Sequence, residues 1–402
     1  MTAGWRVYTV DEIKDSRAGA IAIGPFGSRM KSDRYVASGV PVIRGNNLSD
    51  TPTFTGDFVF VSDATADELR SSNVFPGDLV FPHRGAIGAV GVVPAGGPAR
   101  YILSTSLMKL SCNRELVDPL FLFYFFRSRD GRNALLARAS TVGTPGIGQP
   151  LASLRSISIL LPPLHEQQAI AEVLGVLDDK IDLNRRMSET LEAVAAALLA
   201  NARSTTGPWR RAALQDISDV TMGQSPPGDT YNTEGNGWPF YQGRADFGFR
   251  FPSRRVFCTS PTRIGAAGSV LLSVRAPVGS LNVAEEEVAL GRGVAAIHAR
   301  SDCRSLLYHS LRLDSAGWDV FNGEGTVFGS VNKQDVLAYT LEWPDEDEAE
   351  QLEARLRPLD DLVLANRLES LTIEALRDLL LPQLTSGSVQ VKAAQQLVEE
   401  VV

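Results

Sequence analysis

The chain has 402 residues, of which 44% are hydrophobic and 21% charged, an ordinary globular composition that is long enough for two or three domains. It contains no run of about 18 apolar residues and no basic-then-apolar start, so we expect a cytoplasmic protein that is neither membrane-bound nor secreted. Its three cysteines form no CxxC pair, which fits reduced thiols and argues against a metal site.

The formal net charge of −8 is unevenly distributed. Lys and Arg exceed Asp and Glu by 4 in residues 1–160 and balance them in 205–341. The acids are in excess by 3 in residues 161–204 and by 9 in 342–402. The acidic segments are the two long helices predicted below, so the neutral-to-basic globular parts remain candidates for binding nucleic acid.

Residues 1–160 are predicted to form strands joined by turns. Alternating apolar runs, bounded by Gly, Pro, Asn and Asp, lie at 40–43, 58–61, 78–81, 89–93 and 106–110. The segment 117–128 differs, because Asp118-Pro119 is a helix start and the following apolar density indicates a buried helix. Its five aromatic residues are expected in the core rather than stacked on bases. A further strand is predicted at 157–161.

One long amphipathic helix is predicted to begin behind Pro162-Pro163 and to run to residue 202. At ~1.5 Å per residue it would be roughly 55 Å long, so it needs a partner helix. A 4-3 spacing, with one extra three-residue step, predicts a coiled-coil seam with a stammer. The predicted seam is Ile170, Leu174, Leu177, Ile181, Asn184, Met187, Leu191, Val194 and Leu198.

The partner helix is predicted in the same chain, 182 residues later, behind Pro344. Identical residues recur at this offset without a gap, which indicates a duplication. Asn184 and Asn366 occupy matched seam positions and are interpreted as a register device. The second predicted seam is Leu352, Leu356, Leu359, Val363, Asn366, Ile373, Leu376 and Leu380, with Glu369 at the stammer.

Residues 205–341 repeat the plan of the first globular part. GDLVFPHRGAIG aligns without a gap onto GSVLLSVRAPVG and places Arg84 opposite Arg275. Residues 26–48, in contrast, show no counterpart in residues 223–249. We interpret this pattern as a duplicated frame with divergent inserts, which suggests one task performed on two different targets.

The sequence therefore predicts a mixed α/β (α+β) fold with an internal repeat. The expected order is a globular domain at 1–160, a spacer helix at 161–204, a second globular domain at 205–341, a second spacer helix at 342–384 and a tail at 385–402. The tail is polar and then apolar, and we expect it to fray or to dock weakly.

No catalytic or metal site is predicted. The Pro-Pro pairs after Leu161 and Ser225 lack the aromatic residue of a base-amino methyltransferase motif, and no Gly-Lys dipeptide is present for a P-loop. The four histidines lie outside the usual contexts of nucleophilic catalysis. The six-residue separation of Cys303 and His309 does not fit metal ligands on a helix.

These features together resemble the specificity subunit of type I restriction-modification enzymes. LPPLHEQQAIAEVLGVLDDKIDLN is similar to that family's central repeat, and LTIEALRDLLLPQLTSG is similar to its C-terminal counterpart. The paired glycine motifs resemble a looser motif of its target recognition domains. The second helix departs from the pattern, since it begins Pro-Asp-Glu-Asp where Pro-Leu-x-Glu-Gln is usual, so its first turn is expected to contact partners differently.

The resemblance implies two target recognition domains that each read half of a bipartite site in double-stranded DNA. Two antiparallel coiled-coil helices, related by a pseudo-two-fold repeat, would set the spacer and dock two methylation subunits. Those subunits would bring S-adenosylmethionine, and restriction subunits would bring ATP, Mg²⁺ and cleavage. This chain would hold no cofactor and catalyse neither reaction, because a reader needs phosphate and base-edge contacts rather than catalytic groups.

Candidate DNA-contacting residues are polar or basic residues in the Gly-rich loops. In the first domain they are Arg29, Lys31, Arg34, Arg44, Asn46, Asn47, Arg84, Thr144 and Gln149. In the second they are Gln242, Arg244, Arg254, Arg255, Arg275, Asn322, Thr326, Asn332 and Lys333. Arg84 and Arg275 stand out because the motif around them is duplicated.

Two other classes of function remain open from the residues alone. A coiled-coil scaffold that binds only proteins would show no affinity for DNA even with its partners present. A recognition subunit of a related methylation and cleavage enzyme, or of a phage-exclusion system, would use the same readers with a different enzyme attached.

Overall fold

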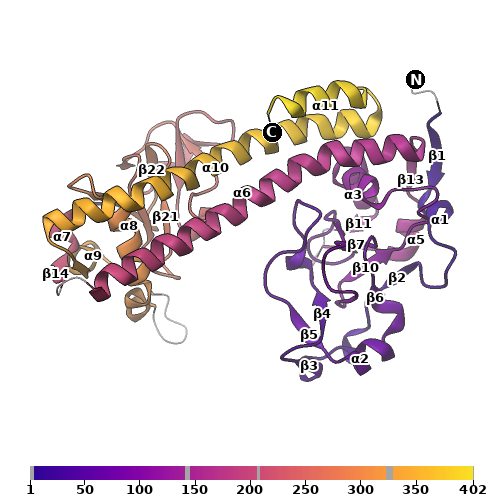
Figure 1. Cartoon of the computed structure of the whole chain (residues 1–402), viewed down its shortest axis with the longest axis horizontal. Coiled ribbons are helices and arrows are strands. Elements are labelled where there is room, and N and C mark those ends of the chain that lie inside the picture. Colours follow the sequence, from indigo (N-terminus) through magenta and orange to yellow (C-terminus); the bar gives the residue numbers. More distant parts are fainter. Residues whose placement is uncertain (1–3, 141–144, 206–208, 323–328, 402) are drawn as a thin grey trace. The chain divides into compact units, whose positions relative to one another are not determined.

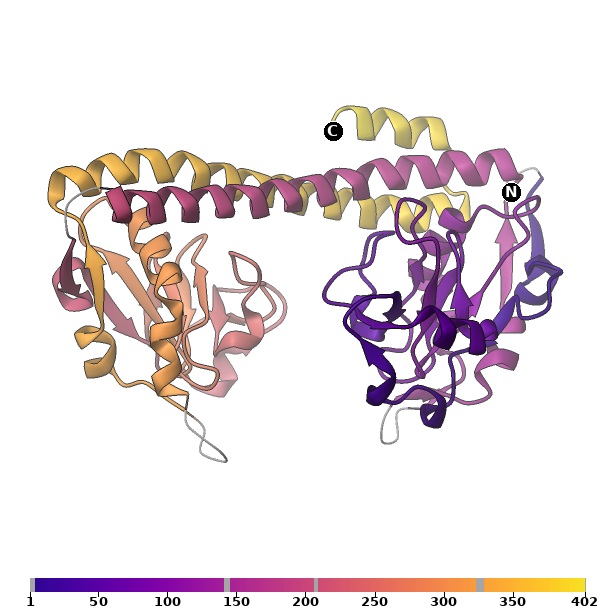
Figure 2. The same cartoon turned by 60° about the horizontal axis from the view of Figure 1, so that its bottom comes forward.

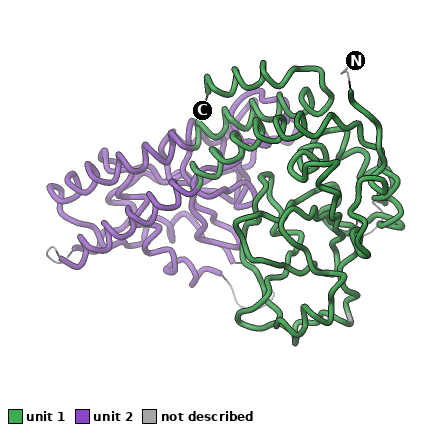
Figure 3. Tube along the Cα trace, turned by 45° about the vertical axis from the view of Figure 1, so that its right-hand side comes forward, with its two compact units in different colours: residues 1–185, 367–402 green, residues 186–366 purple. Residues whose placement is uncertain are grey.

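The computed structural model describes residues 4–140, 145–205, 209–322 and 329–401. Its internal contacts divide the chain into two compact units, which Figure 3 shows in two colours. Unit 1 comprises residues 1–185 and 367–402, and unit 2 comprises residues 186–366. Each unit therefore combines one globular part with portions of both long helices. No helix in the described part of the chain is long and apolar enough to span a membrane.

The two long helices are α6 (Leu164–Thr205) and α10 (Glu346–Ser386), labelled in Figure 1. In unit 1, Asp178 of α6 bonds to Arg377 of α10, and Asn184 bonds to Ser370. Moving forward along α6 from residue 178 to 184 therefore moves the partner backward along α10, from 377 to 370. This register is antiparallel, and it confirms the predicted coiled-coil packing of two long helices.

Burial along α6 contradicts the predicted stammer. Met187 and Val194 are 42% and 47% exposed, whereas their neighbours Ser188 and Ala195 are buried. The seam therefore takes a four-residue step after Asn184 and continues as a regular heptad pattern. The prediction was wrong because it favoured large apolar side chains, while the packed positions here hold small ones.

Ten of the predicted seam residues lie on the packed faces of the two helices. Leu174, Leu177, Asn184, Leu356, Val363, Asn366 and Ile373 are buried, and Ile181, Leu191 and Leu359 are half-buried. In unit 1, Asn184 Nδ2 lies 3.3 Å from Ser370 Oγ. In unit 2, Asn366 Nδ2 lies 3.2 Å from Ser188 Oγ. The same amide–hydroxyl contact thus recurs in each unit, which supports the interpretation of both asparagines as register devices.

The globular part of unit 1 contains a five-stranded sheet, a four-stranded sheet and two short antiparallel pairs. The orders are β3-β5-β4-β9-β6, β2-β10-β7-β8, β1-β13 and β11-β12. The strands are β1 (Arg6–Thr9), β2 (Ile21–Ile23), β3 (Tyr35–Val36), β4 (Val40–Ile43), β5 (Val59–Val61), β6 (Asn73–Val74), β7 (Leu79–Pro82), β8 (Gly91–Val92), β9 (Tyr101–Leu103), β10 (Leu107–Leu110), β11 (Ala139–Ser140), β12 (Gly146–Ile147) and β13 (Ser158–Leu161). The helices are α1 (Val10–Ile13), α2 (Asp63–Glu68), α3 (Pro119–Arg127), α4 (Arg129–Leu136) and α5 (Pro150–Arg155).

The aromatic helix α3 forms the centre of the core of unit 1. Asp118 caps it, accepting hydrogen bonds from the backbone N–H groups of Leu120 and Phe121. All five of its aromatic side chains are buried, together with apolar residues of the four-stranded sheet, α6 and α10. The predicted helix and its core role are therefore confirmed.

Unit 2 has a five-stranded and a four-stranded sheet of the same topology, seen in Figure 2 beneath its portions of the long helices, and one short antiparallel pair among its described residues. The orders are β16-β18-β17-β22-β19, β15-β23-β20-β21 and β14-β24. The strands are β14 (Arg210–Ala213), β15 (Ser218–Met222), β16 (Tyr231–Asn232), β17 (Trp238–Tyr241), β18 (Phe257–Cys258), β19 (Ile264–Gly265), β20 (Val270–Ser273), β21 (Leu281–Val283), β22 (Val288–Leu290), β23 (Val294–Ala299) and β24 (Thr340–Trp343). The shorter helices are α7 (Leu214–Ile217), α8 (Arg304–Leu313) and α9 (Lys333–Ala338).

The matching topology contradicts the prediction that residues 26–48 have no counterpart in residues 223–249. Both segments contain, in this order, a 3₁₀ turn, a two-residue strand, a four-residue strand and another 3₁₀ turn, and residues 26–48 have one additional 3₁₀ turn before these, Gly27–Arg29. The four-residue strands β4 and β17 each pair in parallel, with β9 and β22 respectively. The correspondence was missed because Val40 matches Trp238, 198 residues later, whereas the helices match at an offset of 182. Loops of unequal length shift the register between these anchors.

The tail contains a helix, α11 (Val391–Glu399), rather than a frayed segment. Gly387 adopts a positive φ of 71° just after α10, and α11 follows. Ala394 and Val398 are buried in the core of unit 1. The expectation that the tail frays is therefore wrong, because the spacing of its few apolar residues gives a helix with one packed face; that it docks weakly stays a prediction.

Candidate nucleic-acid interface

In unit 1, several loops leave the two sheets at the same end. The parallel pairing of β4 with β9 brings Ile43 beside Leu103, and β10 then runs antiparallel to both β2 and β7. The turn at 104–106 lies between these loops, since Ser104 N–H donates to Ile43 O and His83 N–H donates to Ser106 O, both at 2.9 Å. We call the segments after β2, β4 and β7, together with this turn, the loop end of unit 1.

Arg84 lies at the loop end of unit 1 with an exposed side chain. Its backbone bridges to Gly146, and Gly85 N–H donates to Pro145 O at 2.9 Å, so the segment from residue 145 to Gln149 belongs to the same surface. Gln149 is exposed and has a φ of 50°, a left-handed conformation that costs a non-glycine residue energy. Such strain clusters at functional sites, which favours Gln149 as a contact residue.

Unit 2 has an equivalent loop end, formed by the segments after β15, β17 and β20 and the turn at 291–293. Val274 N–H donates to Gly293 O at 2.9 Å and brings the β20 loop against that turn. Arg275 is exposed and bridges to Ser330, as Arg84 bridges to Gly146. The structure records no ion pair or hydrogen bond of either guanidinium with the described residues, so both charges face outward.

Arg292 is a candidate that the sequence analysis missed. It is exposed at the tip of the β22–β23 turn, between two buried glycines. A Cβ at Gly293 would lie 2.2 Å from Gln242 O, and one at Gly291 would lie 2.9 Å from Gln242 Cα. Both glycines are therefore needed for the turn to pack against Gln242, which holds Arg292 beside a predicted reader. The Gly-Arg-Gly pattern between two apolar runs was the available signal.

Phe26 is a second missed candidate, in unit 1. It is 77% exposed on the segment after β2. Gly24 fixes the start of this segment, because a Cβ there would lie 1.9 Å from Ser104 O. An exposed aromatic ring on an anchored loop can contact a base or a sugar. The signal in the sequence was Gly-Pro-Phe-Gly, which a structural turn also explains.

Several predicted readers lie exposed on the segments that form the two loop ends. They are Asn46, Arg84 and Gln149 in unit 1 and Gln242, Arg244 and Arg275 in unit 2, while Asn332 and Lys333 are exposed just after Ser330, which bridges to Arg275. Arg44 is half-buried, and its guanidinium donates to Asp57 O at 2.7 Å. Arg29, Lys31 and Arg34 are exposed; Arg34 pairs with Glu68 at 2.8 Å, and Arg29 donates to the Glu68 carbonyl. Thr144 and Thr326 lie outside the described residues.

Three of the predicted readers make structural hydrogen bonds; this corrects the assignment of Asn47, which is buried, while Asn322 and Asn332 stay predictions. Asn47 is fully buried, where its amide donates to Thr55 O and Asp57 O, so it cannot reach a base edge. Asn322 accepts from Val278 N–H at 2.7 Å and holds the loop after Arg275. Asn332 caps α9 through a reciprocal pair of hydrogen bonds with Asp335. Asn at turns and helix starts satisfies local backbone groups, a bonding role that composition alone does not distinguish from base recognition.

Arg254 and Arg255 are exposed but paired within their own unit. Arg254 lies 2.8 Å from Glu286, and Arg255 pairs with Asp246. The Arg254–Glu286 pair is exposed on both sides and therefore weak, so a DNA phosphate could replace Glu286 at low energetic cost, whereas Asp246 is buried.

The described residues contain no grouping of His, Cys, Asp and Glu that could hold a metal ion. All three cysteines are buried and free. Burial raises the pKa of the Cys112 thiol to about 12, so it stays protonated. Burial also lowers the pKa of His83 at the loop end.

Comparison with known proteins agrees with this geometry. Residues 4–193 match the family model described as type I restriction modification DNA specificity domain. A protein from Methanocaldococcus jannaschii, assigned as the MjaX type I restriction enzyme specificity subunit, is 27% identical over 377 residues, 88% of each chain. The HindI specificity subunit from Haemophilus influenzae is 33% identical over 121 residues, 30% of this chain and 26% of that protein. The crystal structure of a type I S subunit from M. genitalium shares the fold, with a TM-score of 0.57, 15% identity and coverage of 95% and 96% of the two chains.

Proposed function

Because the chain belongs to the type I restriction-modification specificity family, we propose that it is a DNA-recognition subunit in which each globular part reads one half of a bipartite site. The observation that carries this proposal is the pair of loop ends. Both are built on the same strand pairings and present an outward arginine at the same place, Arg84 or Arg275. Their neighbours differ, with Phe26 and Gln149 in one and Gln242 and Arg292 in the other. A common frame with different side chains suits the reading of two different half-sequences.

We further propose that the long helices set the distance between the half-sites and dock methylation subunits, in two copies. S-adenosylmethionine would then belong to those subunits, and ATP, Mg²⁺ and cleavage to restriction subunits. In this proposal the chain itself contributes position and sequence recognition, and no reacting group.

Replacing Arg84 or Arg275 by Ala tests the readers. If the guanidinium binds a guanine bidentately, each variant loses about 1 to 3 kcal/mol of binding and relaxes one position of one half-site only. Methylated-motif mapping with the assembled complex measures this, and Arg6→Ala on β1 and Arg300→Ala are the controls. If both variants gave the same methylated motif and the same affinity as the controls, neither arginine would have a role in reading the sequence.

Lengthening both long helices tests their proposed role in spacing. Because Asn366 bonds to Ser188, the matched sites are directly after Ser188 and directly before Asn366. Seven residues at each site add roughly 10 Å at ~1.5 Å per residue and preserve the heptad phase. The spacer should lengthen by about three base pairs at ~3.4 Å each, with both half-sequences unchanged. An active complex with an unaltered spacer would contradict the proposal.

A further inference from the structure

Unit 1 contains a pocket of about 470 Å³ that no part of the proposed reading mechanism uses. It lies where residues 48–50, on the segment after β4, meet the start of α4 and the C-terminal part of α10. Its charged lining consists of Asp50, Arg127, Arg129, Arg132, Arg377 and Asp378. Four arginines and two aspartates leave an excess of positive charge.

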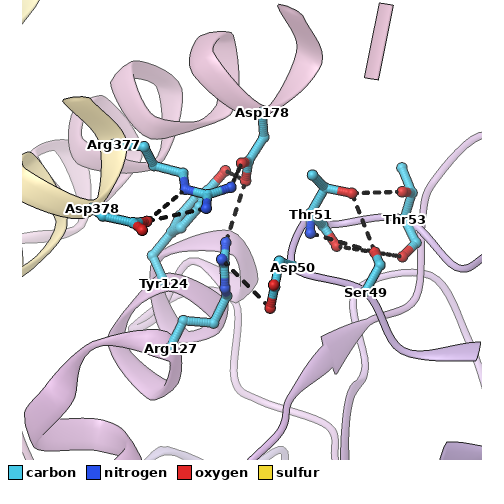
Figure 4. A network of polar contacts seen from close by, with 9 residues as sticks. All are labelled: Ser49, Asp50, Thr51, Thr53, Tyr124, Arg127, Asp178, Arg377 and Asp378. Atoms are coloured by element: carbon cyan, nitrogen blue, oxygen red, sulfur yellow. Dashed lines mark hydrogen bonds and ion pairs between the residues drawn. The ribbon is translucent and has the colours of Figure 1, made fainter. Parts of the chain in front are cut away.

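Arg127 lies at the floor of this pocket and lacks a close partner. Its side chain is only 11% exposed, and its buried Nη1 makes no hydrogen bond. Its ion pairs are long, at 3.7 Å to Asp178 and 3.8 Å to Asp50. Asp178 is already held by Arg377 Nη1 at 2.7 Å and by the Tyr124 hydroxyl at 2.8 Å, as Figure 4 shows. Two guanidiniums thus share one carboxylate, and the charge of Arg127 is under-compensated.

The rim of the pocket adds charge without closing it. Arg129 and Arg132 are exposed and make no ion pair with the described residues. Asp50, whose side chain is 92% exposed, sits in a loop pinned by hydroxyl bonds, among them Ser49 Oγ to Thr53 O at 2.6 Å (Figure 4). Asp50 therefore lies at the edge of the pocket and makes only the long, 3.8 Å ion pair with Arg127.

In unit 2, a side chain of the protein itself occupies the corresponding place in the fold. There the corresponding loop carries Arg250, which is 4% exposed and binds Glu192 at 2.7 Å and Asp360 at 2.8 Å. The long helices supply a carboxylate in both units, Asp178 or Asp360, but the loop carries the cation Arg250 in unit 2 and the anion Asp50 in unit 1. In unit 1 Asp178 is already bound by Arg377, and Asp50 comes no closer than 3.8 Å to Arg127. An external anion would supply the close partner that Arg127 lacks.

We propose that this pocket of unit 1 binds an oxyanion of the phosphate class, held by Arg127 at the floor and by Arg129 and Arg132 at the rim. Guanidinium groups recognise phosphate oxygens by paired, charge-assisted hydrogen bonds. The phosphate comes from a duplex backbone or from a free nucleotide, since both present the same group. The site does not rest on the proposed reading of DNA, because it can be measured without DNA.

Calorimetric titration of the full chain with pyrophosphate at low ionic strength tests the site. Wild type should bind saturably, and Arg132→Gln and Arg127→Gln should each weaken binding about tenfold or more, the loss of a charge-assisted hydrogen bond. Asp50→Asn should tighten binding several-fold, because it removes a negative charge beside Arg127. Asp50 and Arg132 are exposed, so their variants do not threaten folding, and Arg6→Gln is the matched control.

A second titration identifies the source of the phosphate. If duplex DNA supplies it, Arg132→Gln weakens binding to a non-specific duplex, lowers the salt slope by about one and makes pyrophosphate a competitor. If a free nucleotide supplies it, duplex affinity is unchanged while pyrophosphate binding is lost. Absence of saturable pyrophosphate binding, or equal binding by wild type and all three pocket variants, would overturn the proposal.

Discussion

Asp178 and Asp360 occupy matched positions in the two long helices, but different parts of the protein bind them. In unit 1, Asp178 receives Arg377 from the opposite helix. In unit 2, Asp360 receives Arg250 from a loop of the globular part, at 2.8 Å, and His309 at 2.9 Å. The duplicated helix therefore kept a buried carboxylate while the cation moved from helix to loop. Conserving the anion and relocating its partner lets one frame carry two different globular parts.

The starts of helices α3 and α8 also differ between the units in which residue supplies the cap. In unit 1 the N-terminus of α3 is capped by Asp118 from its own chain segment. In unit 2 no side chain at the start of α8 caps it, and Glu353 of α10 accepts the Leu306 N–H instead, at 2.9 Å. A cap requires only an oxygen at the right place, so the duplication could change its source without losing the bond.

The change of partner also changes the electrostatics of the two carboxyls. Burial raises the pKa of Asp178 and outweighs the lowering by Arg377. Burial acts in the same direction on Asp360, but the hydrogen bond from His309 and the charge of Arg250 outweigh it and lower the pKa. Unit 2 thus favours the ionised carboxylate and unit 1 disfavours it.

Arg250→Met should give the largest effect. It removes the cation that Glu192 and Asp360 share and leaves them only Arg312 and His309, so we expect a loss of about 3 kcal/mol, at the lower end for a broken buried ion pair. Urea unfolding measures the loss. Arg300→Met, which breaks only an exposed pair with Asp219, should cost less than about 1 kcal/mol. If both variants lost a similar amount of unfolding free energy, Arg250 would stabilise unit 2 no more than an exposed ion pair does.

Tyr124→Phe should have an intermediate effect, confined to the unit 1 arrangement. The hydroxyl donates to Asp178 at 2.8 Å in the core, so its removal leaves a buried carboxylate with one bond fewer and costs about 1 to 3 kcal/mol. Tyr35→Phe, at an exposed position, should change the free energy of unfolding little. An unchanged midpoint for Tyr124→Phe would show that Arg377 alone satisfies Asp178.

The smallest expected effect concerns pH. The loss of unfolding free energy caused by Asp178→Asn and that caused by Asp360→Asn should change in opposite directions as pH rises. A raised pKa contributes stability that is full below the unfolded value of 3.8 and is lost as pH rises through the folded pKa. The penalty of Asp178→Asn should therefore shrink with rising pH. A lowered pKa contributes stability above 3.8 that is lost as pH falls, so the penalty of Asp360→Asn should grow with rising pH. The measurement is the unfolding free energy of wild type and both variants between pH 3 and pH 7. Penalties that change with pH in the same direction for both variants would contradict the difference between the two carboxyls.

The sequence predicted the long helices, the strand at 40–43 and the buried aromatic helix because each depends on local periodicity. It failed where small or polar residues carried the packing. Ser188 and Ala195 kept the heptad regular, and Asn47 turned inward to bond the backbone. Residue type alone does not separate these roles, since the partner groups come from other segments.

By itself, the sequence determined the order of the elements and the duplication of the helices. Gapless repeats and the 3.6-residue period can be recognised along the chain without knowledge of tertiary contacts. Only the tertiary structure decided that residues 26–48 and 223–249 form the same strands, that Arg292 and Phe26 lie at the loop ends, and that Arg250 completes unit 2 while Arg127 lacks a close partner in unit 1. The physical reason is that strand pairing and buried charge depend on contacts between distant segments, whose spacing along the chain changes with every loop length.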